Sequence, residues 1–380
     1  MSSEIYFDHA ATTPLDRRVY EAMAPYLETS YGNPSSVYRL ARVSRAAVDG
    51  ARDLVAEVLG ARGAEVIFTS GGTESDNAAL KGVAFARPGG HVITTRIEHH
   101  AVLHSAQFLE RLGHPVTYLP VDQFGVVDPD AVGRAIRPDT ALISVMHANN
   151  EIGTIQPIAE IARVARARKV PLHVDAVQSA GALPIEVDAL GVDLLSLSGH
   201  KLYGPKGTGV LYIRRGTVFW PFLHGGGQER GRRAGTENVA GIVGMAEALR
   251  LANTEHEARN QITRGLRDRL IAGVRRTWPT ARLTGHPDLR LPNHASFVLP
   301  GVSGESLLLA LDQRGIMAST GSACTSGSLE PSHVLLALGL EPSLAEGSLR
   351  LTVGHRNTEA EVEQFLGVLP RVLDAVIAPR

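Results

Sequence analysis

The residue with the clearest chemical potential is Cys324, the only cysteine among the 380 residues of the chain. It lies in the run ASTGSACTSGS (318–328), where no side chain is large enough to anchor a core. Because the chain has no second cysteine, it can form neither an intrachain disulfide nor a cysteine-rich metal cluster. A single thiol in a pliable segment of small residues is typical of a nucleophile that takes a group from a substrate and carries it away. An incidental loop thiol is the alternative interpretation.

A second reactive group is the amine of Lys201, one of only four lysines in the chain. It follows the strand-like run LLSL (194–197) in the segment SGHK (198–201). An amine at the ligand-binding edge of a sheet is suited to Schiff-base formation with a carbonyl compound. A phosphate-binding P-loop is excluded here, because Gly204 is followed by proline and not by the lysine that such a loop requires.

The segment TSGGTESDN (69–77) indicates a site for an anion. It follows a strand-like run and opens a helix-like one. Glycines and hydroxyl groups at a helix N-terminus present backbone N–H groups and a favourable dipole to a phosphate. From this segment alone, an ordinary helix cap is an equally good interpretation.

Two further polar groups follow strand-like runs. Asp175 ends the run LHVD (172–175), where its carboxylate could hold a cationic ring nitrogen or cap the next helix, and Gln178 follows three residues later. His99 is placed to face a bound ring. The neighbouring His100 and His104 have the i,i+4 spacing of metal ligands on a helix, but the sequence offers no further set of ligands for a metal.

Ligands of open α/β sheets bind at the carboxyl ends of the strands. A phosphate cradle, a carboxylate for a ring nitrogen, an amine and a histidine are all expected there. This combination is what pyridoxal 5′-phosphate (PLP) requires of a protein. We therefore predict a PLP site formed by these segments.

The elements that must position these groups alternate along residues 37–250. Short apolar runs alternate with helix-like stretches at 37–59, 74–86, 100–112, 129–136 and 157–168. This pattern predicts an α/β fold with a mainly parallel central sheet covered by helices on both faces, and an added strand at 209–213, either parallel or antiparallel. A long helix is expected at about 237–276. We predict a large domain of residues 14–257, with residues 1–13 and 258–380 forming a smaller α+β domain that carries Cys324.

Composition excludes several classes of function. The net charge of −1 gives no electrostatic reason to expect a nucleic acid or an anionic membrane as the main partner. No apolar run approaches the roughly 18 residues of a membrane span. The N-terminal residues lack the features of a targeting sequence, and a single cysteine argues against an oxidising compartment. A cytoplasmic protein is the resulting expectation.

At this point the motifs resemble, nearly end to end, those of the class V aminotransferase-like enzymes of PLP fold type I, and most closely the NifS/IscS-like cysteine desulfurases. The segments that carry the resemblance are DHAATTP (8–14), GNPSS (32–36), 69–77, EH (98–99), HANNEIG (147–153), HVDAVQS (173–179), SGHK (198–201), 225–236 and GSAC (321–324). Any one of them is a weak signal. Their number and order make the resemblance specific.

The resemblance implies roles for individual residues. Lys201, rather than Lys206, matches the Schiff-base lysine, Asp175 the partner of the pyridinium nitrogen, and Gln178 the partner of the phenolic oxygen. His99 would stack on the ring and assist proton transfer. The remaining matches are the phosphate-binding residues Gly72, Thr73, Ser198 and His200, the substrate-side and cofactor-side residue Asn150, the substrate-carboxylate residue Arg350, and Thr236, which would reach the phosphate of the other subunit in a homodimer.

The implied activity is desulfuration of L-cysteine to L-alanine, with the sulfur left as a persulfide on Cys324 for iron–sulfur cluster assembly or another thiolation pathway. An acceptor protein such as an iron–sulfur scaffold is the implied partner. Three alternatives remain at this stage. One is a different class V enzyme, a selenocysteine lyase or a small-amino-acid aminotransferase. The second is a non-catalytic sulfur carrier or scaffold-binding protein, and the third is a metal hydrolase built on His100 and His104.

Overall fold

A seven-stranded sheet forms the centre of the larger part of the molecule in the computed structural model, which describes residues 4–321 and 331–377. All neighbouring strands are parallel except for β8, which runs antiparallel to both of its neighbours, β2 and β7. The spatial order is β2 (Val66–Thr69), β8 (Gly209–Ile213), β7 (Leu194–Ser198), β6 (Leu172–Asp175), β5 (Thr140–Met146), β3 (His91–Thr95) and β4 (Val116–Leu119). The predicted mainly parallel sheet, with an added strand at 209–213, is confirmed, and this strand is antiparallel.

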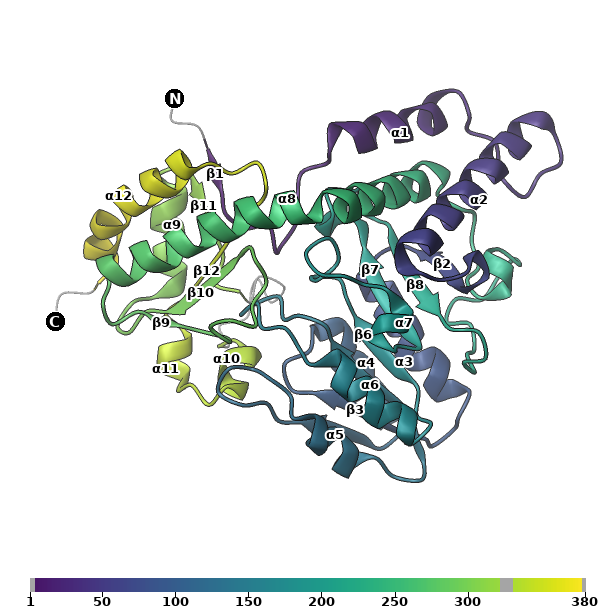
Figure 1. Ribbon diagram of the computed structural model, residues 1–380, viewed down its shortest axis with the longest axis horizontal. Helices are drawn as coiled ribbons and strands as arrows, with labels where there is room; N and C mark the ends of the chain where they lie inside the picture. The colour runs from purple at the N-terminus through teal and green to yellow at the C-terminus, as the bar shows by residue number, and fades with distance from the viewer. Residues whose placement is uncertain (1–3, 322–330, 378–380) are drawn as a thin grey trace.

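Helices cover both faces of this sheet, as Figure 1 shows. Successive residues of a strand point to opposite faces. Accordingly, Leu142 of β5 packs in a core with helices α3 and α4, whereas Ile143 packs in a second core with α2, α6 and α8. The helices of this part are α1 (Arg17–Glu28), α2 (Arg39–Leu59), α3 (Gly72–Phe85), α4 (His100–Arg111), α5 (Pro129–Ala135), α6 (Ile158–Ala167) and α7 (Val187–Leu190). Burial on both faces explains why the strands read as continuous apolar runs.

The second part of the molecule has a core of its own. Its sheet is antiparallel, in the order β12 (Ser348–Thr352), β10 (His294–Val298) and β9 (Arg282–Leu283). Around it lie the short parallel pair β1 (Ile5–Tyr6) and β11 (Ile316–Met317), and the helices α9 (Gly304–Asp312), α10 (His333–Ala337), α11 (Pro342–Ala345) and α12 (Glu359–Val376). Phe297, Leu351 and Phe365 are fully buried in this core.

Helix α8 (Val239–Thr277) joins the two parts and crosses most of the width of Figure 1. Its first half, up to Ala252, packs in a core of the larger part, and its second half, from Leu266, packs in the core of the smaller part. The predicted long helix at 237–276 is confirmed. A continuous helix fixes the distance between the two cores, which matters because the candidate site lies between them.

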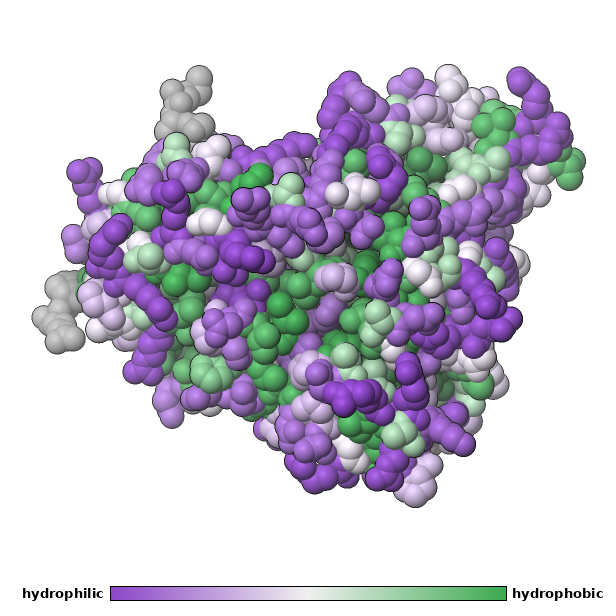
Figure 2. Space-filling view, in the orientation of Figure 1, coloured by the Kyte–Doolittle hydropathy of each residue, from purple (hydrophilic) through white to green (hydrophobic). Residues whose placement is uncertain are grey.

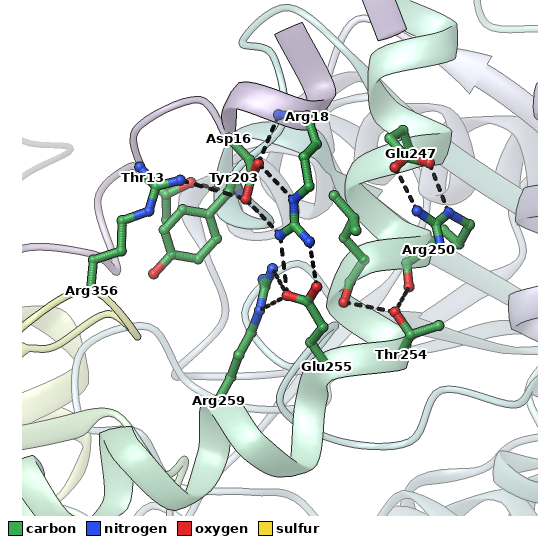
Figure 3. Close-up of polar contacts among 11 residues, drawn as sticks. Thr13, Asp16, Arg18, Tyr203, Glu247, Arg250, Thr254, Glu255, Arg259 and Arg356 are labelled. Carbon is green, nitrogen blue, oxygen red and sulfur yellow. Dashed lines mark hydrogen bonds and ion pairs between the residues drawn. The ribbon is translucent and has the colours of Figure 1, made fainter. Parts of the chain in front are cut away.

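The N-terminal residues 7–13, here called the N-terminal strap, run from the smaller part to the larger one. At one end, Thr352 of β12 donates its N–H to the Phe7 carbonyl at 2.7 Å. At the other end, Thr13 N–H donates to the His200 carbonyl at 2.9 Å. Beyond the strap, Asp16 caps α1 and joins the network of ion pairs drawn in Figure 3.

Among the helices of residues 4–321 and 331–377, none combines the length and the apolarity that a membrane span requires.

Candidate active site

A cavity of about 360 Å³ opens at the carboxyl ends of the parallel strands, between the strap, the start of α3 and β12. Ten of the residues singled out from the sequence line it: Gly72, Thr73, His99, Asn150, Asp175, Gln178, Ser198, His200, Lys201 and Arg350. Six others complete the lining without having been predicted: Ala10, Ala11, Asp76, Met146, Val177 and Gly321. The structure therefore brings most of the predicted residues into one place.

One end of the cavity is suited to a phosphate group. Gly72 and Thr73 form the first turn of α3, where backbone N–H groups have no partner within the helix and the dipole favours an anion. A Cβ atom at Gly72 would lie 2.8 Å from Cγ2 of Val177, so only glycine allows this close approach. Ser198 and His200 face the same end from β7 and the turn after it.

The middle of the cavity carries a buried carboxyl group, that of Asp175 at the end of β6. Burial raises the pKa of this carboxyl to about 6, while the hydrogen bond from Val177 N–H and the charge of Lys201 act in the opposite direction. A carboxylate in this position is stabilised by a cation placed beside it. A protonated ring nitrogen is such a cation, so Asp175 fits the role predicted for it.

Sequence reasoning missed Asp76, a second carboxyl group on the cavity wall. It lies on α3 and is 1% exposed, with Oδ1 lying 3.6 Å from Nε2 of His173. Burial, followed by the charge of Asp175, raises the pKa of Asp76 well above its ordinary range. The segment TESDN contains this residue, but the sequence gives no sign that its side chain faces the cavity rather than solvent.

Beneath these carboxyl groups lies a buried polar chain across three strands. His173 of β6 bonds through Nδ1 to Ser144 Oγ of β5 at 2.8 Å, and through Nε2 to Ser196 Oγ of β7 at 2.9 Å. Burial lowers the pKa of His173 to about 3, so the imidazole is neutral. A satisfied polar network of this kind fixes the strand ends that carry Asp175.

His99 has a defined tautomer. It is the N-cap of α4, where its Nδ1 accepts the N–H of Ala101 at 3.1 Å. Burial, followed by the positive charge of Lys201, lowers the pKa of His99 to about 4. The ring is therefore neutral at pH 7, and because Nδ1 accepts a hydrogen bond, Nε2 carries the proton.

Lys201 is held by the N-terminal strap. Its Nζ donates to the carbonyl oxygens of Ala10 and Ala11, the latter at 2.7 Å. Gln178 Nε2 also donates to the Ala10 carbonyl, at 3.0 Å. These contacts hold the amine at the cavity wall.

The opposite end of the cavity is suited to a carboxylate. Arg350 of β12 is 2% exposed, and its Nη1 donates to the carbonyl oxygens of Asn150 at 2.9 Å and Gly321 at 3.2 Å. Its Nη2 forms an ion pair with Asp8 Oδ1 at 2.6 Å. A guanidinium fixed in this way still has one Nη2 hydrogen to donate to a second carboxylate.

His100, His104 and Thr236, all named from the sequence, do not line this cavity. His100 and His104 do approach each other, with ring centroids 4.9 Å apart, and His333 lies 4.7 Å from His100. However, among residues 4–321 and 331–377, no three histidine, cysteine or acidic side chains are arranged to hold a metal ion. Thr236 is exposed and does not line the cavity of its own chain. Cys324 lies outside the described residues.

The residues present thus fit PLP, which they could hold at its phosphate, at its ring nitrogen and through an amine. Comparison with known proteins agrees with this geometry. The sequence pattern of the family described as "Aminotransferase class-V" matches residues 5–365. The chain belongs to the class V aminotransferase family.

Individual relatives narrow this assignment. A protein of Dictyoglomus turgidum named cysteine desulfurase IscS is 52% identical over 376 residues, which cover 98% of this chain and 95% of that protein. A solved NifS-like protein superposes with a TM-score of 0.92 at 39% identity, covering 98% of this chain and all of the other. A solved complex of the protein SspA with cysteine gives a TM-score of 0.82 at 38% identity, covering 93% of this chain and all of the other. The fold is that of the PLP-dependent transferases of fold type I, and the family is PLP-dependent.

Proposed function

We propose that this chain is a PLP-dependent cysteine desulfurase, which converts L-cysteine to L-alanine and transfers the sulfur to Cys324 as a persulfide. The proposal rests on one observation: Lys201, Asp175 and Arg350 line the same cavity. An amine, a carboxylate for a ring nitrogen and a carboxylate-binding arginine are the groups that PLP chemistry on an amino acid needs. The relatives named IscS and the solved complex of SspA with cysteine support L-cysteine as the substrate.

Bound PLP would supply an electron-withdrawing ring that makes the Cα–H bond of the attached amino acid acidic. The chain supplies the rest. Arg350 and Asn150 would bind and orient the substrate carboxylate, and Asp175 would keep the ring nitrogen protonated. Lys201 would accept the Cα proton and return a proton to the substrate. Neutral His99 would stack on the ring and could donate from Nε2. Gln178 would hold the phenolic oxygen, and Gly72, Thr73, Ser198 and His200 would hold the phosphate.

Sulfur transfer itself belongs to Cys324. Its thiolate attacks the substrate sulfur, the Cβ–S bond breaks, and the electron pair of that bond stays with the carbon fragment that becomes L-alanine. The new S–S bond is the persulfide. The small residues on either side of Cys324 in the sequence favour a segment that can deliver the thiol to the cavity. A separate acceptor protein, such as an iron–sulfur scaffold, would then take up the sulfur.

The division into domains follows from the two cores. We propose a large domain of residues 14–257 and a small domain of residues 1–13 and 258–380. The boundary near residue 257 is supported by the change of packing partner along α8 between Ala252 and Leu266. The strap then belongs to the small domain and reaches across the site to Lys201.

A homodimer is the proposed assembly. Large apolar side chains are exposed around the connection between α1 and α2, where Figure 2 shows hydrophobic groups at the tip of the molecule. They are Leu27, Tyr31, Val37, Tyr38 and Val43, and Val37 is 87% exposed. Exposed apolar patches of this kind favour a protein interface. In the dimer, exposed Thr236 would reach the phosphate of the partner subunit's cofactor. Sedimentation of the protein with Val37→Asp beside the wild type tests the assembly.

The experiment that tests the activity measures L-alanine and sulfide released from L-cysteine in the presence of a thiol reductant. Wild type is compared with Cys324→Ala, and retention of the yellow cofactor is checked in both. We expect turnover in the wild type and none in the variant. Equal turnover in both would remove Cys324 from the reaction and leave another class V activity. A colourless, inactive wild type would contradict the enzyme proposal itself.

A further inference from the structure

The arginine that lines the cavity, Arg350, is held by a residue that does not line it. Arg350 lines the cavity, whereas Asp8, which pairs with its Nη2 at 2.6 Å, does not. The side chain of Arg350 is 3% exposed and that of Asp8 16% exposed. The Asp8 carboxylate therefore pairs with the guanidinium without itself lining the cavity.

We propose that Asp8 is a positioning residue for the substrate: its carboxylate fixes the Arg350 guanidinium in the orientation that receives the α-carboxylate of the amino acid. The inference rests on the proposed function, in which Arg350 binds that carboxylate. Asp8 itself touches neither the substrate nor the cofactor and acts only through Arg350.

The reason lies in the surroundings of the guanidinium. Its Nη1 is already committed to two backbone carbonyls, and its Nε is buried without a hydrogen-bond partner. A long, buried cationic side chain loses much rotamer freedom and needs a charge partner. Asp8 supplies both the partner charge and the restraint on Nη2. Nearby His294 stays neutral, since burial and, secondarily, the charge of Arg350 lower its pKa to about 3.

Asp8 is itself fixed by the backbone of the strap. The N–H of His9 donates to the Thr352 carbonyl at 3.2 Å, and the N–H of Ala10 donates to Thr352 Oγ1 at 2.9 Å. Tyr6 donates its hydroxyl to the Asp8 carbonyl at 3.0 Å. None of these bonds uses the Asp8 side chain. Replacing its carboxylate by an amide should therefore leave the strap, and with it the contacts to Lys201, in place.

The test uses two ligands that differ only in the carboxylate, L-alanine and ethylamine. Each is titrated into the PLP-loaded enzyme, and its dissociation constant is read from the absorbance of the bound cofactor. We expect Asp8→Asn to raise the dissociation constant of L-alanine about tenfold, because the partner of a buried, hydrogen-bonded charge is lost. The dissociation constant of ethylamine should stay within about twofold of the wild-type value, since ethylamine has no carboxylate for Arg350. For L-cysteine turnover, KM should rise much more than kcat falls.

The controls separate this inference from the proposal on which it rests. Arg350→Gln should also weaken L-alanine selectively, and if it does not, the substrate role of Arg350 is wrong. If Arg350→Gln weakens L-alanine but Asp8→Asn does not, only the positioning role of Asp8 is wrong. Equal weakening of L-alanine and ethylamine by Asp8→Asn would mean general damage to the site and would also overturn the inference. If Asp8→Asn does not retain the cofactor, Asp8→Glu replaces it in the test, because glutamate keeps the charge but displaces it. Asp8→Glu should likewise weaken the binding of L-alanine and leave that of ethylamine within about twofold.

Discussion

Ser332 donates its hydroxyl to Oε2 of Glu151 at 2.5 Å, in a contact buried between the two parts of the molecule. The same oxygen lies against Gly321, where an added Cβ would come within 3.2 Å of it and where φ is +95°. Gly321 and Ser332 lie on either side of the sequence segment that contains Cys324. One buried carboxyl group therefore lies against the chain on both sides of the segment that contains Cys324.

This relationship predicts a selective loss of sulfur transfer. We expect Glu151→Ala to lower kcat for L-cysteine by about tenfold or more, since misplacing a reacting group by about 1 Å can cost about 100-fold. The affinity for L-alanine should change little, because alanine needs no thiol. Glu151→Gln keeps an acceptor for the Ser332 hydroxyl and should retain most of the activity. Steady-state turnover and alanine titration check the pair of variants. An alanine variant with wild-type kcat would show that this anchor has no part in transfer.

A second prediction concerns acid stability. Burial is the largest cause of lowered pKa values, to about 3 or 4, in seven histidines: His9, His99, His147, His173, His200, His294 and His355. In the unfolded chain a histidine titrates near 6.5. The unfolded state therefore binds more protons below this pH, and stability falls as the pH decreases from about 6.5 towards 4. Five carboxyls oppose this trend. Burial raises the pKa of Glu98 to about 8 and that of Asp175 to about 6, and it also raises the pKa values of Asp76, Glu151 and Asp193.

Below about pH 6.5 the seven histidines outnumber the five carboxyls, and they decide the sign. The thermal unfolding midpoint of the PLP-loaded protein, measured from about pH 8 to pH 5, should rise slightly down to about pH 6.5, as the carboxyls with raised pKa values take up protons, and fall below it. The wild type in buffers of equal ionic strength is the appropriate control, because surface ion pairs also respond to salt. A midpoint that rises on acidification below about pH 6.5 would contradict the neutral state assigned to these histidines.

The sequence predicted the sheet and much of the cavity for a physical reason. Strand-like runs end directly before Asp175 and Ser198, and parallel strands place such ends side by side, so position along the chain was enough. Contacts between segments far apart in the sequence could not be predicted from position along the chain. Asp8 and Arg350 are 342 residues apart, and Ala10 meets Lys201 across 191 residues. These pairs depend on how the strap crosses from one part to the other, which no local pattern encodes.

A third prediction concerns the ion pairs of Figure 3, which join α1 to α8 and to the smaller part. Asp16 accepts from Arg18 N–H at 2.9 Å as the cap of α1, and it pairs with Arg18 at 3.0 Å and with Arg356 at 3.5 Å. These groups, chiefly the hydrogen bond from Arg18, lower the pKa of Asp16 to about 2. Its contribution to stability is therefore complete at pH 7 and is lost only as the pH falls from about 4 to about 2.

Two substitutions separate the cap from the charge. Asp16→Asn keeps a capping oxygen and should cost less than about 1 kcal/mol, because the Arg18 partner is half exposed. Asp16→Ala loses both the capping oxygen and the charge, and it should lower the free energy of unfolding by about 1–3 kcal/mol. Urea unfolding at pH 7 measures each. Glu247→Gln breaks the more exposed pair with Arg250 in the same figure and serves as the matched control. Equal costs for Asp16→Asn and Asp16→Ala would assign the effect to charge alone.

The last prediction concerns Arg52 of α2 and Glu229, which lies in the glycine- and arginine-rich segment before Thr236. Two hydrogen bonds of 2.8 Å join them, and their side chains are 5% and 3% exposed. Glu229 Oε2 also accepts the N–H of Phe68 on β2 at 3.0 Å. Glu229 and the next residue, Arg230, have φ values of +47° and +58°, a conformation that L-residues other than glycine rarely adopt.

The buried ion pair therefore holds a strained turn against the sheet. Glu229→Ala leaves the charge of Arg52 and the N–H of Phe68 without this partner, so we expect a loss of about 3–5 kcal/mol, measured by urea unfolding. The double variant Arg52→Leu, Glu229→Leu removes both charges and should recover part of that loss, since apolar side chains can replace a buried pair. Because the segment leads to Thr236, Glu229→Ala should also weaken PLP retention in the proposed homodimer. A double variant as unstable as Glu229→Ala would mean that the turn, and not the unpaired charge, determines the cost.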